Sequence, residues 1–486
     1  MMSTSTCNAS SLNIYIPSGS NPWDVQKIKH LYRRLGYGAS LSMTNSSFGK
    51  NPAVLVDEII DQALAISPTP APDWVFKTYS DYPSQQAFDE ANQQHINDSK
   101  YQFTVDILQN GFRSRMILFW MNHFVTQQEV YNCAGYLFQY YDVLQRNALG
   151  NFKEFTRAIG ITPAMLHFLN GFDNTSEEPN ENYARELYEL FTLGENNGYT
   201  QFDIEETARA LTGYNTSPDY CGQIAFNEEN TFDTTEKTIF GRKGNWGYDD
   251  VIDILFEEKG ALISRFICQK LYAYFIGPDI NNTIVNQLAE DFKAWNWEIE
   301  PVLRKLFKSE HFFDTANFGI LVKSPIDLTH QFLIETEYPQ DEDGFNTIKY
   351  IHYVLGQDIF QPVDVAGWQR NHDWINSGTL TGRWIMMEWV IYRSLELDQP
   401  KFRQFAKDIS GNSKNPEVIT RAMINHFTSK ELASPEDYEV ATTILKGEVP
   451  ENYYTEGIWN LDYEYAHWQL LDLLFHIARM PEFQLK

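Results

Sequence analysis

The segment PNENYARELYELFTLG, residues 179–194, has the clearest helical pattern in the chain. Pro179 stands where a helix can begin without losing a hydrogen bond, and Gly194 stands where one can end in the left-handed conformation. With about 100° of rotation per residue, apolar side chains fill one side of this helix, which we predict over 180–193. The opposite side carries three carboxylates around one arginine, beside an asparagine: Glu181, Asn182, Arg185, Glu186 and Glu189.

A second helix should follow directly, in YTQFDIEETARALTG (199–213), where Thr200 and Asp203 approximate a capping box and Gly213 ends the helix. The same three-and-four spacing of apolar residues predicts further helices over 25–35, 54–64, 85–110, 113–128, 134–147, 152–160, 249–276, 283–294, 299–308, 318–336, 379–396, 416–427 and 465–479. The one predicted strand pair joins IAF (224–226) to KTIF (237–240). We therefore expect an all-α fold: mainly helical, with two packed helical lobes and at most one small β-hairpin.

The predicted domain organisation is simple. Residues 1–20 are rich in Ser, Thr and Asn and should form a flexible N-terminal lead-in. Residues 21–486 should form a single helical unit, because no internal repeat divides them. Gly and Pro cluster between 213 and 247, so the alternative is two lobes, 21–215 and 245–486, joined by a loop and hairpin region over 216–244.

Composition excludes several classes of protein. Of the 486 residues, 43% are hydrophobic and 21% are charged, as in a globular protein. The formal charge of −27 would repel a phosphate backbone, so we expect no nucleic-acid partner. No apolar run approaches the roughly 18 residues of a membrane span, so we expect no integral membrane segment. The N-terminus lacks a secretory signal, which predicts a cytoplasmic location at face value and leaves export of a processed form open.

Cysteine and histidine spacing gives no metal or redox signature. The four cysteines, Cys7, Cys133, Cys221 and Cys268, lie far apart without a CxxC motif, which argues against a disulfide framework and predicts buried thiols. The histidines are scattered without metal-ligand spacing, so we predict no tight structural zinc or iron–sulfur site and name no metal-binding residue. HExxH, GxSxG, P-loop and Rossmann motifs are all missing from the sequence, which leaves the cofactor unknown.

The charged face of the 180–193 helix has two interpretations. It could be a solvated surface with Glu–Arg pairs at i,i+4, or the wall of a cleft, where crowded carboxylates do acid/base chemistry or hold a divalent cation. Because Glu181 and Glu189 lie beside Arg185, Glu186 is the better acid/base candidate. In a buried network, Arg185→Ala would cost roughly 3 kcal/mol or more, and we expect a large loss of stability there and little at Glu186.

Two other segments carry candidate site residues. His123, in RSRMILFWMNHFVT (113–126), lies at helical spacing among apolar residues and is most simply a histidine at the edge of the core. The segment PVDVAGWQRNHDWINSGTLTGRW (362–384) is a long irregular connection that mixes polar and aromatic residues. Such a loop is typical of a functional site, although a packed Trp-rich lid is equally compatible.

Taken together, these segments resemble the bacterial family catalogued as domain of unknown function 1800. The resemblance covers about residues 25–486 and rests on HLYRRLGYGAS (30–40), FWMNHFVT (119–126), NALGNFKEFTRAIGITPAMLHFLN (147–170), the acidic segment 179–194, ARALTGY (208–214), KTIFG (237–241), KSPID (323–327), DVAGW (364–368) and PEFQ (481–484). It implies a helical, largely uncharacterised protein that is often encoded beside a sulfatase-like protein. The resemblance therefore supplies a possible sulfatase-like partner and no reaction.

The chain departs from this family at one position. Before KTIFG the family usually has a His-Asp pair, and here the pair is Phe232-Asp233. Asp233 and Lys237 remain, whereas any role of the histidine is lost.

Two hypotheses follow for the function. The first is an enzyme or small-ligand binder acting on a polar, carbohydrate-like substrate, a class suggested by the aromatic content of 15% and the sulfatase-like neighbour. Its predicted catalytic residues are His123, Glu181, Arg185, Glu186, Asp233 and Lys237. Its predicted binding residues are Asn180, Asn182, Glu189, Asp364, Trp368 and His372. The alternative is a non-catalytic interaction partner whose acidic motif is a structural ion-pair network, and Phe232 favours it. The oligomeric state stays open.

Overall fold

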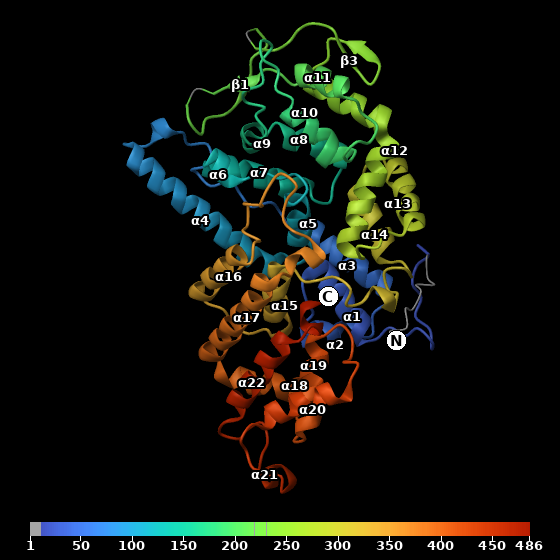
Figure 1. Cartoon of the computed structure of the whole chain (residues 1–486), viewed down its shortest axis with the longest axis vertical. Helices are drawn as coiled ribbons and strands as arrows, with labels where there is room; N and C mark the ends of the chain where they lie inside the picture. The colour runs from blue at the N-terminus through green and yellow to red at the C-terminus, as the bar shows by residue number, and fades with distance from the viewer. Residues whose placement is uncertain (1–10, 218, 230) are drawn as a thin grey trace.

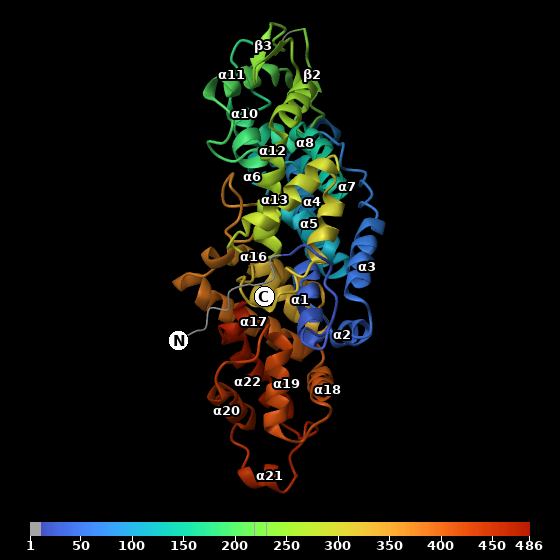
Figure 2. The same ribbon diagram turned by 90° about the vertical axis from the view of Figure 1, so that its right-hand side faces the viewer.

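The structure, a computed structural model, describes residues 11–217, 219–229 and 231–486. Their fold is mainly helical and elongated (Figures 1 and 2), which confirms the predicted fold class. The N-terminal part contains α1 (Val25–Gly36), α2 (Leu41–Ser47), α3 (Pro52–Ala65), α4 (Gln85–Asn110), α5 (Phe112–Met121), α6 (Gln128–Tyr131), α7 (Ala134–Asn147), α8 (Phe152–Gly160), α9 (Pro163–Phe168), α10 (Asn182–Glu186) and α11 (Gln201–Ala210).

The chain then forms four short strands before the remaining helices. The strands are β1 (Tyr214–Thr216), β2 (Ala225–Phe226), β3 (Lys237–Ile239) and β4 (Arg242–Gly244). The remaining helices are α12 (Tyr248–Phe275), α13 (Asn282–Ala294), α14 (Ile299–Phe307), α15 (Pro325–Thr336), α16 (Glu342–Val354), α17 (Ser377–Leu397), α18 (Gln399–Ser410), α19 (Pro416–Phe427), α20 (Pro435–Lys446), α21 (Glu451–Thr455) and α22 (Ala466–Arg479).

Most predicted helices occur close to the predicted residues. Helices α7, α8 and α19 begin and end where the apolar spacing placed them. The predicted 318–336 helix is wrong in its first turns, because Ser324 caps α15 and Pro325 takes its first position. The helices α2, α6, α9, α16, α18, α20 and α21 were not predicted.

The predicted β-hairpin is wrong in its pairing. Strand β2 pairs with β1, through Tyr214 and Phe226, and β3 pairs with β4, through Lys237 and Gly244. Phe240 and Gly241 both have positive φ, so the chain reverses directly after β3. This local turn closes a much shorter loop than a pairing between β2 and β3 would require.

The cysteine prediction is wrong for one pair. Cys133, which precedes α7, forms a disulfide with Cys221 in the connection between β1 and β2. The two residues are separated by 88 positions, so spacing could not reveal a pairing that the tertiary fold brings about. Cys268 is a buried free thiol, as predicted, and Cys7 lies outside the described residues.

The predicted lead-in and lobes can be compared with the packing of the described residues. Leu12 and Tyr15 are buried, and the Tyr15 amide donates to the carbonyl of Lys308 at 2.8 Å, while residues 1–10 lie outside the described residues. Buried apolar side chains form two clusters: a large one dominated by α1 to α14 and another formed by α15 to α22. The division into lobes 21–215 and 245–486 stays a prediction.

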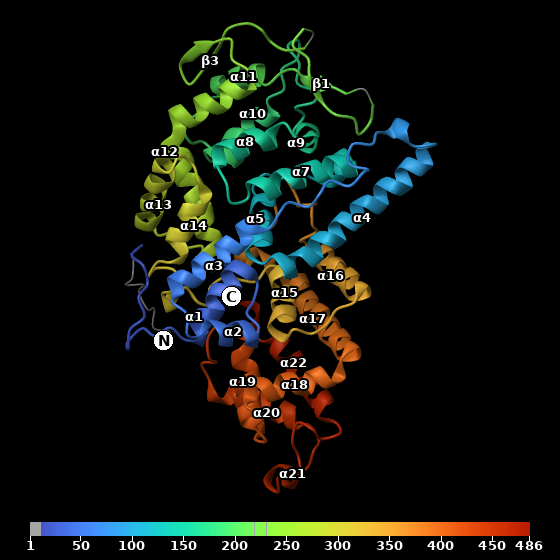
Figure 3. The same ribbon diagram turned by 180° about the vertical axis from the view of Figure 1, so that it is seen from behind.

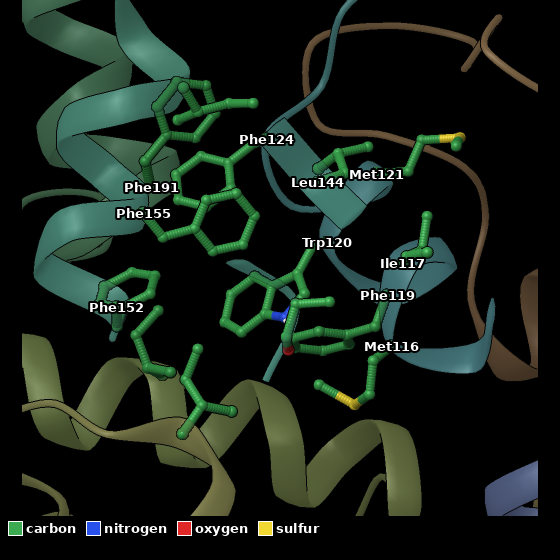
Figure 4. Close-up of a cluster of buried hydrophobic side chains, with 14 of the residues drawn as sticks. Met116, Ile117, Phe119, Trp120, Met121, Phe124, Leu144, Phe152, Phe155 and Phe191 are labelled. Atoms are coloured by element: carbon green, nitrogen blue, oxygen red, sulfur yellow. The ribbon is translucent and has the colours of Figure 1, made fainter. Parts of the chain in front are cut away.

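Helix α5 lies deep inside the larger cluster. All of its residues from Phe112 to Met121 are buried, and the Trp120 indole donates to the Ala148 carbonyl at 2.8 Å. Figure 4 shows the aromatic rings of Phe124, Phe152 and Phe155 grouped around Trp120. The end of this helix is therefore held rigidly, and the next residues, 122 and 123, are positioned by the core.

Candidate functional site

A cavity of about 590 Å³ opens beside the end of α5. Its walls come mainly from four segments that are distant in sequence: residues 118–123, residues 266–280 from the second half of α12 onward, residues 321–327 and the loop 368–374. Gln357 and Lys486 complete them. In Figure 1 an orange loop from the C-terminal half rises among the blue-green helices of the N-terminal part. Lys486 itself lies near the middle of the molecule (Figures 1 and 3).

A glycine allows the loop to approach α5 closely. Gly367 has φ +98°, and a Cβ there would lie 2.1 Å from the side-chain oxygen of Asn122. The same oxygen accepts a hydrogen bond of 2.6 Å from the Trp368 amide. Further along, the Asn371 side-chain oxygen accepts from the Val322 amide at 2.9 Å. These contacts fix the loop on both sides of Arg370.

His123 is buried in the cavity wall, with 3% of its surface exposed. Its Nε2 lies 3.0 Å from the carbonyl oxygen of Phe191, which can only accept, so Nε2 carries the hydrogen. Its Nδ1 lies 3.0 Å from Lys270 Nζ and accepts a hydrogen bond from it. Burial, followed by the charge of Lys270, holds the pKa of His123 well below its ordinary value, and the imidazole is neutral.

Lys270, from α12, is the second polar group in this wall. Its Nζ also donates to the carbonyl of Leu190 at 2.9 Å and lies 4.6 Å from the centre of the Phe266 ring. Burial, followed by the nearby charge of Arg370, holds the pKa of Lys270 well below its ordinary value. Within the described ranges, no carboxylate forms an ion pair with Lys270.

The C-terminal end of the acidic helix supplies the two carbonyls. After α10 the chain continues as a π-helical segment, Leu187–Thr192, in which the Leu193 amide bonds to the Tyr188 carbonyl at 2.8 Å. A helix end leaves its last carbonyls without helical partners and carries partial negative charge. The carbonyls of Leu190 and Phe191 therefore accept from Lys270 and His123.

Arg370 lies in the loop and lines the cavity. It is solvent-accessible, yet enough protein surrounds it that desolvation lowers the pKa of its guanidinium. Its one polar contact with a described residue is a long hydrogen bond of 3.4 Å, which it donates to the Ala366 carbonyl. Among the described residues it has no ion-pair partner, as is also true of Lys270.

Asp327, on the other side of the cavity, is already neutralised. Arg115 pairs with it at 2.6 Å, and Lys486 pairs with its second oxygen. These two cations hold the pKa of Asp327 well below its ordinary value, against the opposing effect of burial. The carboxylate also accepts a hydrogen bond from Ser324 in the capping box of α15. Its role is therefore structural.

The predicted acidic face is a half-exposed ion-pair network. Arg185 donates to Glu181 at 2.8 Å, to Gln201 at 3.0 Å and to Glu189 at 3.5 Å. Its side chain is 36% exposed, so the buried network that would make Arg185 indispensable for stability is absent. The pairs are of the i,i+4 kind that a solvated helix face carries.

Glu186 lies apart from these pairs. It is half-buried, and desolvation together with the charge of Glu189 raises the pKa of its carboxyl group, with Arg185 opposing. Asn180 and Asn182 shape the start of the helix: Asn180 accepts from the Asn182 amide at 3.0 Å, and the Asn182 side chain donates to Asn170.

Asp233 and Lys237 form another cluster, near β3. Asp233 pairs with Arg209 at 2.8 Å and accepts from Thr235. Lys237 is buried, and its Nζ donates to the Asp233 carbonyl and lies 4.7 Å from the centre of the Phe232 ring. Burial lowers the pKa of Lys237. Phe232 thus packs against the lysine.

The structure brings together three of the predicted site residues, His123, Trp368 and His372, which all line the cavity. Asp364 does not line it and instead forms the turn before Gly367, accepting from the Ala366 amide at 2.8 Å. The remaining predicted residues, Asn180, Glu181, Asn182, Arg185, Glu186, Glu189, Asp233 and Lys237, are not among the residues of the cavity wall.

Sequence reasoning missed Lys270 and Arg370 as site residues. A signal for Lys270 was present, because it is an isolated cation within the apolar run of α12, FICQKLYAYF (266–275). Arg370 had no such signal, since an arginine in a polar loop is ordinary. Across the part of the chain that the structure describes, no group of three or more His, Cys, Asp or Glu side chains is placed to hold a metal ion. Over the same residues, no helix combines the length and apolarity needed to cross a membrane.

Comparison with known proteins identifies a family and no function. No curated protein and no solved structure matches the chain. The family model described as "Protein of unknown function (DUF1800)" matches residues 30–485, which is nearly the whole chain. The protein therefore belongs to the DUF1800 family.

Proposed function

We propose that this protein binds a small polar ligand in the cavity beside His123, as an enzyme or as a ligand-binding protein. One observation carries the proposal: His123, Trp368 and His372, singled out in two separate segments, line one cavity. Its volume of about 590 Å³ suits a small molecule.

The lining supports a ligand with both polar and apolar faces. Aromatic rings contribute much of the wall: Phe119, Phe266, Tyr274, Trp368 and Trp374. The Trp368 indole N–H is buried and has no hydrogen-bond partner in the described structure. Rings beside hydrogen-bond donors are the combination that binds sugars and similar polyhydroxyl compounds, so a carbohydrate-like ligand remains the proposed class.

An enzymatic role would draw on the Lys270–His123 pair. A desolvated lysine amine is a stronger base and nucleophile at neutral pH than an exposed one, because less of it is protonated. His123, held in one tautomer by Phe191, orients that amine. In such a role the acidic helix would position Lys270 and His123 through the carbonyls of Leu190 and Phe191, which accept hydrogen bonds from them.

The second candidate is a non-catalytic partner protein, for example of a sulfatase-like protein. The half-exposed pairs of Arg185 with Glu181 and Glu189 favour it, because they give the acidic motif a structural role without any ligand. On this hypothesis the ion pairs and helix caps stabilise a protein whose function is to bind its partner, and the cavity has no role in that function.

A cavity-blocking variant separates the two candidates. Ala273 lines the cavity, and Ala273→Phe fills it without removing a polar group. We expect a panel of mono- and disaccharides and sugar acids to contain compounds that raise the melting temperature of the wild type and of Glu186→Gln but not of Ala273→Phe. A ligand response that survives in Ala273→Phe would contradict the proposal, as would a panel without any response.

We also infer that the chain works in an oxidising compartment, in contrast to the cytoplasmic expectation from its N-terminus. Disulfides such as Cys133–Cys221 persist mainly outside the reducing cytoplasm. Cell fractionation, with alkylation of free thiols before lysis, tests this. Full alkylation of Cys133 in a cytoplasmic fraction would contradict it.

A further inference from the structure

We propose that the ligand of this cavity carries an oxyanion, a carboxylate, sulfate or phosphate group, which lies between Lys270 and Arg370. This inference rests on the proposed function of the cavity and narrows its ligand class.

One hydrogen-bonding position of the Lys270 side-chain nitrogen is not used by the described residues. Its nitrogen is tetrahedral, and two of its positions are directed to His123 Nδ1 and to the Leu190 carbonyl. No hydrogen bond to a described residue uses the third position, and Lys270 belongs to the cavity wall. Since His123 is neutral and Leu190 offers only a carbonyl, neither partner supplies the negative charge that an ammonium group needs.

Arg370 has even fewer partners. Its guanidinium has five N–H donors, and its one hydrogen bond to a described residue is the 3.4 Å contact with the Ala366 carbonyl. It lies close enough to Lys270 and His123 that its charge lowers the pKa of both groups. The Arg370 charge disfavours the protonated form of Lys270, and an anion between the two groups would relieve this repulsion and favour the ammonium form.

The other charged groups around the cavity do not supply that anion. Asp327 is paired with Arg115 and Lys486. Asp373 and His372 line the cavity from the loop, and Asp373 forms no ion pair with Lys270 or Arg370 in the described structure. The cations therefore point to a charged ligand.

The test uses pyridoxal 5′-phosphate and pyridoxal as a matched pair of probes. In each, the Lys270 amine attacks the aldehyde carbon, water leaves, and borohydride reduces the resulting imine to a stable secondary amine. Pyridoxal also closes to an internal hemiacetal, which leaves it less free aldehyde than the phosphate ester has. The ratio of labelling at Lys270, measured by peptide mass spectrometry, is therefore divided by the same ratio at exposed lysines, and this normalised ratio reports recognition of the anion.

We expect this normalised ratio to be about ten at Lys270, as one charge-assisted contact allows. In Arg370→Met the ratio should fall towards one. Arg265→Met is the matched control, because Arg265 is an exposed residue of the same helix as Lys270, and it should leave the ratio unchanged. Inorganic sulfate or phosphate should protect Lys270 more than chloride does at equal ionic strength.

Each remaining outcome has a definite meaning. A normalised ratio of about one, or an unchanged normalised ratio in Arg370→Met, would overturn the oxyanion inference and leave the proposed polar-ligand site intact. If neither probe labels Lys270 while exposed lysines react, the cavity does not admit small polar molecules. Both the inference and the proposed function would then be wrong. Circular dichroism of each variant establishes that it is folded.

Discussion

At the scale of single residues, exposure decides what a charged group does. Arg185 has three partners, but solvent reaches more than a third of its side chain, and water screens each pair. Arg33 has one carboxylate partner, Glu335, at 2.6 Å, yet both side chains are almost fully buried. The first arrangement resembles a surface pair, and the second is a structural requirement.

Arg185→Ala should therefore cost at most about 1 kcal/mol of unfolding free energy. This value replaces the larger cost that a buried network would have implied. Chemical denaturation of the variant, beside Arg146→Ala, measures it; Arg146 forms an exposed i,i+4 pair with Asp142 at 2.7 Å and serves as control. A loss of 3 kcal/mol at Arg185 would restore the buried-network interpretation.

The stability contribution of Glu186 should change with pH in the opposite direction from that of an ion-paired carboxylate. Because folding raises the pKa of Glu186 above its ordinary 4.5, the folded state binds this proton more tightly than the unfolded state. The wild type should lose stability relative to Glu186→Gln as the pH rises above 4.5. Melting temperatures of both proteins between pH 4 and pH 7 test this. An increase in the melting temperature of the wild type relative to the variant as the pH rises would contradict it.

At the scale of elements, chain reversals and helix ends shape the site more than the helices themselves. The π-helical end of the acidic helix presents the carbonyls of Leu190 and Phe191, and Gly367 admits the loop against Asn122. In the same way, the disulfide fixes the start of α7 to the connection between β1 and β2. That connection holds Cys221 at φ 64° and buries it.

The disulfide should contribute measurably to stability. A digest without reductant should yield a peptide pair linking Cys133 to Cys221, and dithiothreitol should lower the unfolding free energy by roughly 2–4 kcal/mol, because the cross-link closes a long loop. The double variant Cys133→Ala/Cys221→Ala should be insensitive to dithiothreitol. Absence of the linked peptide from freshly purified protein would show that the bond does not form.

At the scale of the whole molecule, buried ion pairs join its two apolar clusters. Arg33, on α1, binds Glu335, on α15, through two hydrogen bonds and also donates to carbonyls of Thr428 and His426. Arg115, on α5, binds Asp327 at the start of α15. The cavity lies at this junction, between α5 and α12 on one side and residues 321–327 on the other.

Glu335→Gln should be among the most damaging conservative substitutions in the chain. It would leave Arg33 without a counter-charge beside Lys29, whose own pKa burial lowers to about 7, and should cost about 3–5 kcal/mol. Glu337→Gln, two residues later and exposed, should stay within about 0.5 kcal/mol. Equal denaturation midpoints for the two variants would show that the pair is dispensable.

The sequence by itself determined the helical class, most helix positions and the capping of α11, because these depend on neighbours a few residues apart. It also indicated His123, Trp368 and His372. Tertiary structure alone decided the Cys133–Cys221 bond, the strand partners and the exposure of Arg185, which depend on segments far apart in the chain. It alone brought Lys270 beside His123, 147 positions away, because a cavity forms where separate helices meet and no local pattern encodes their meeting.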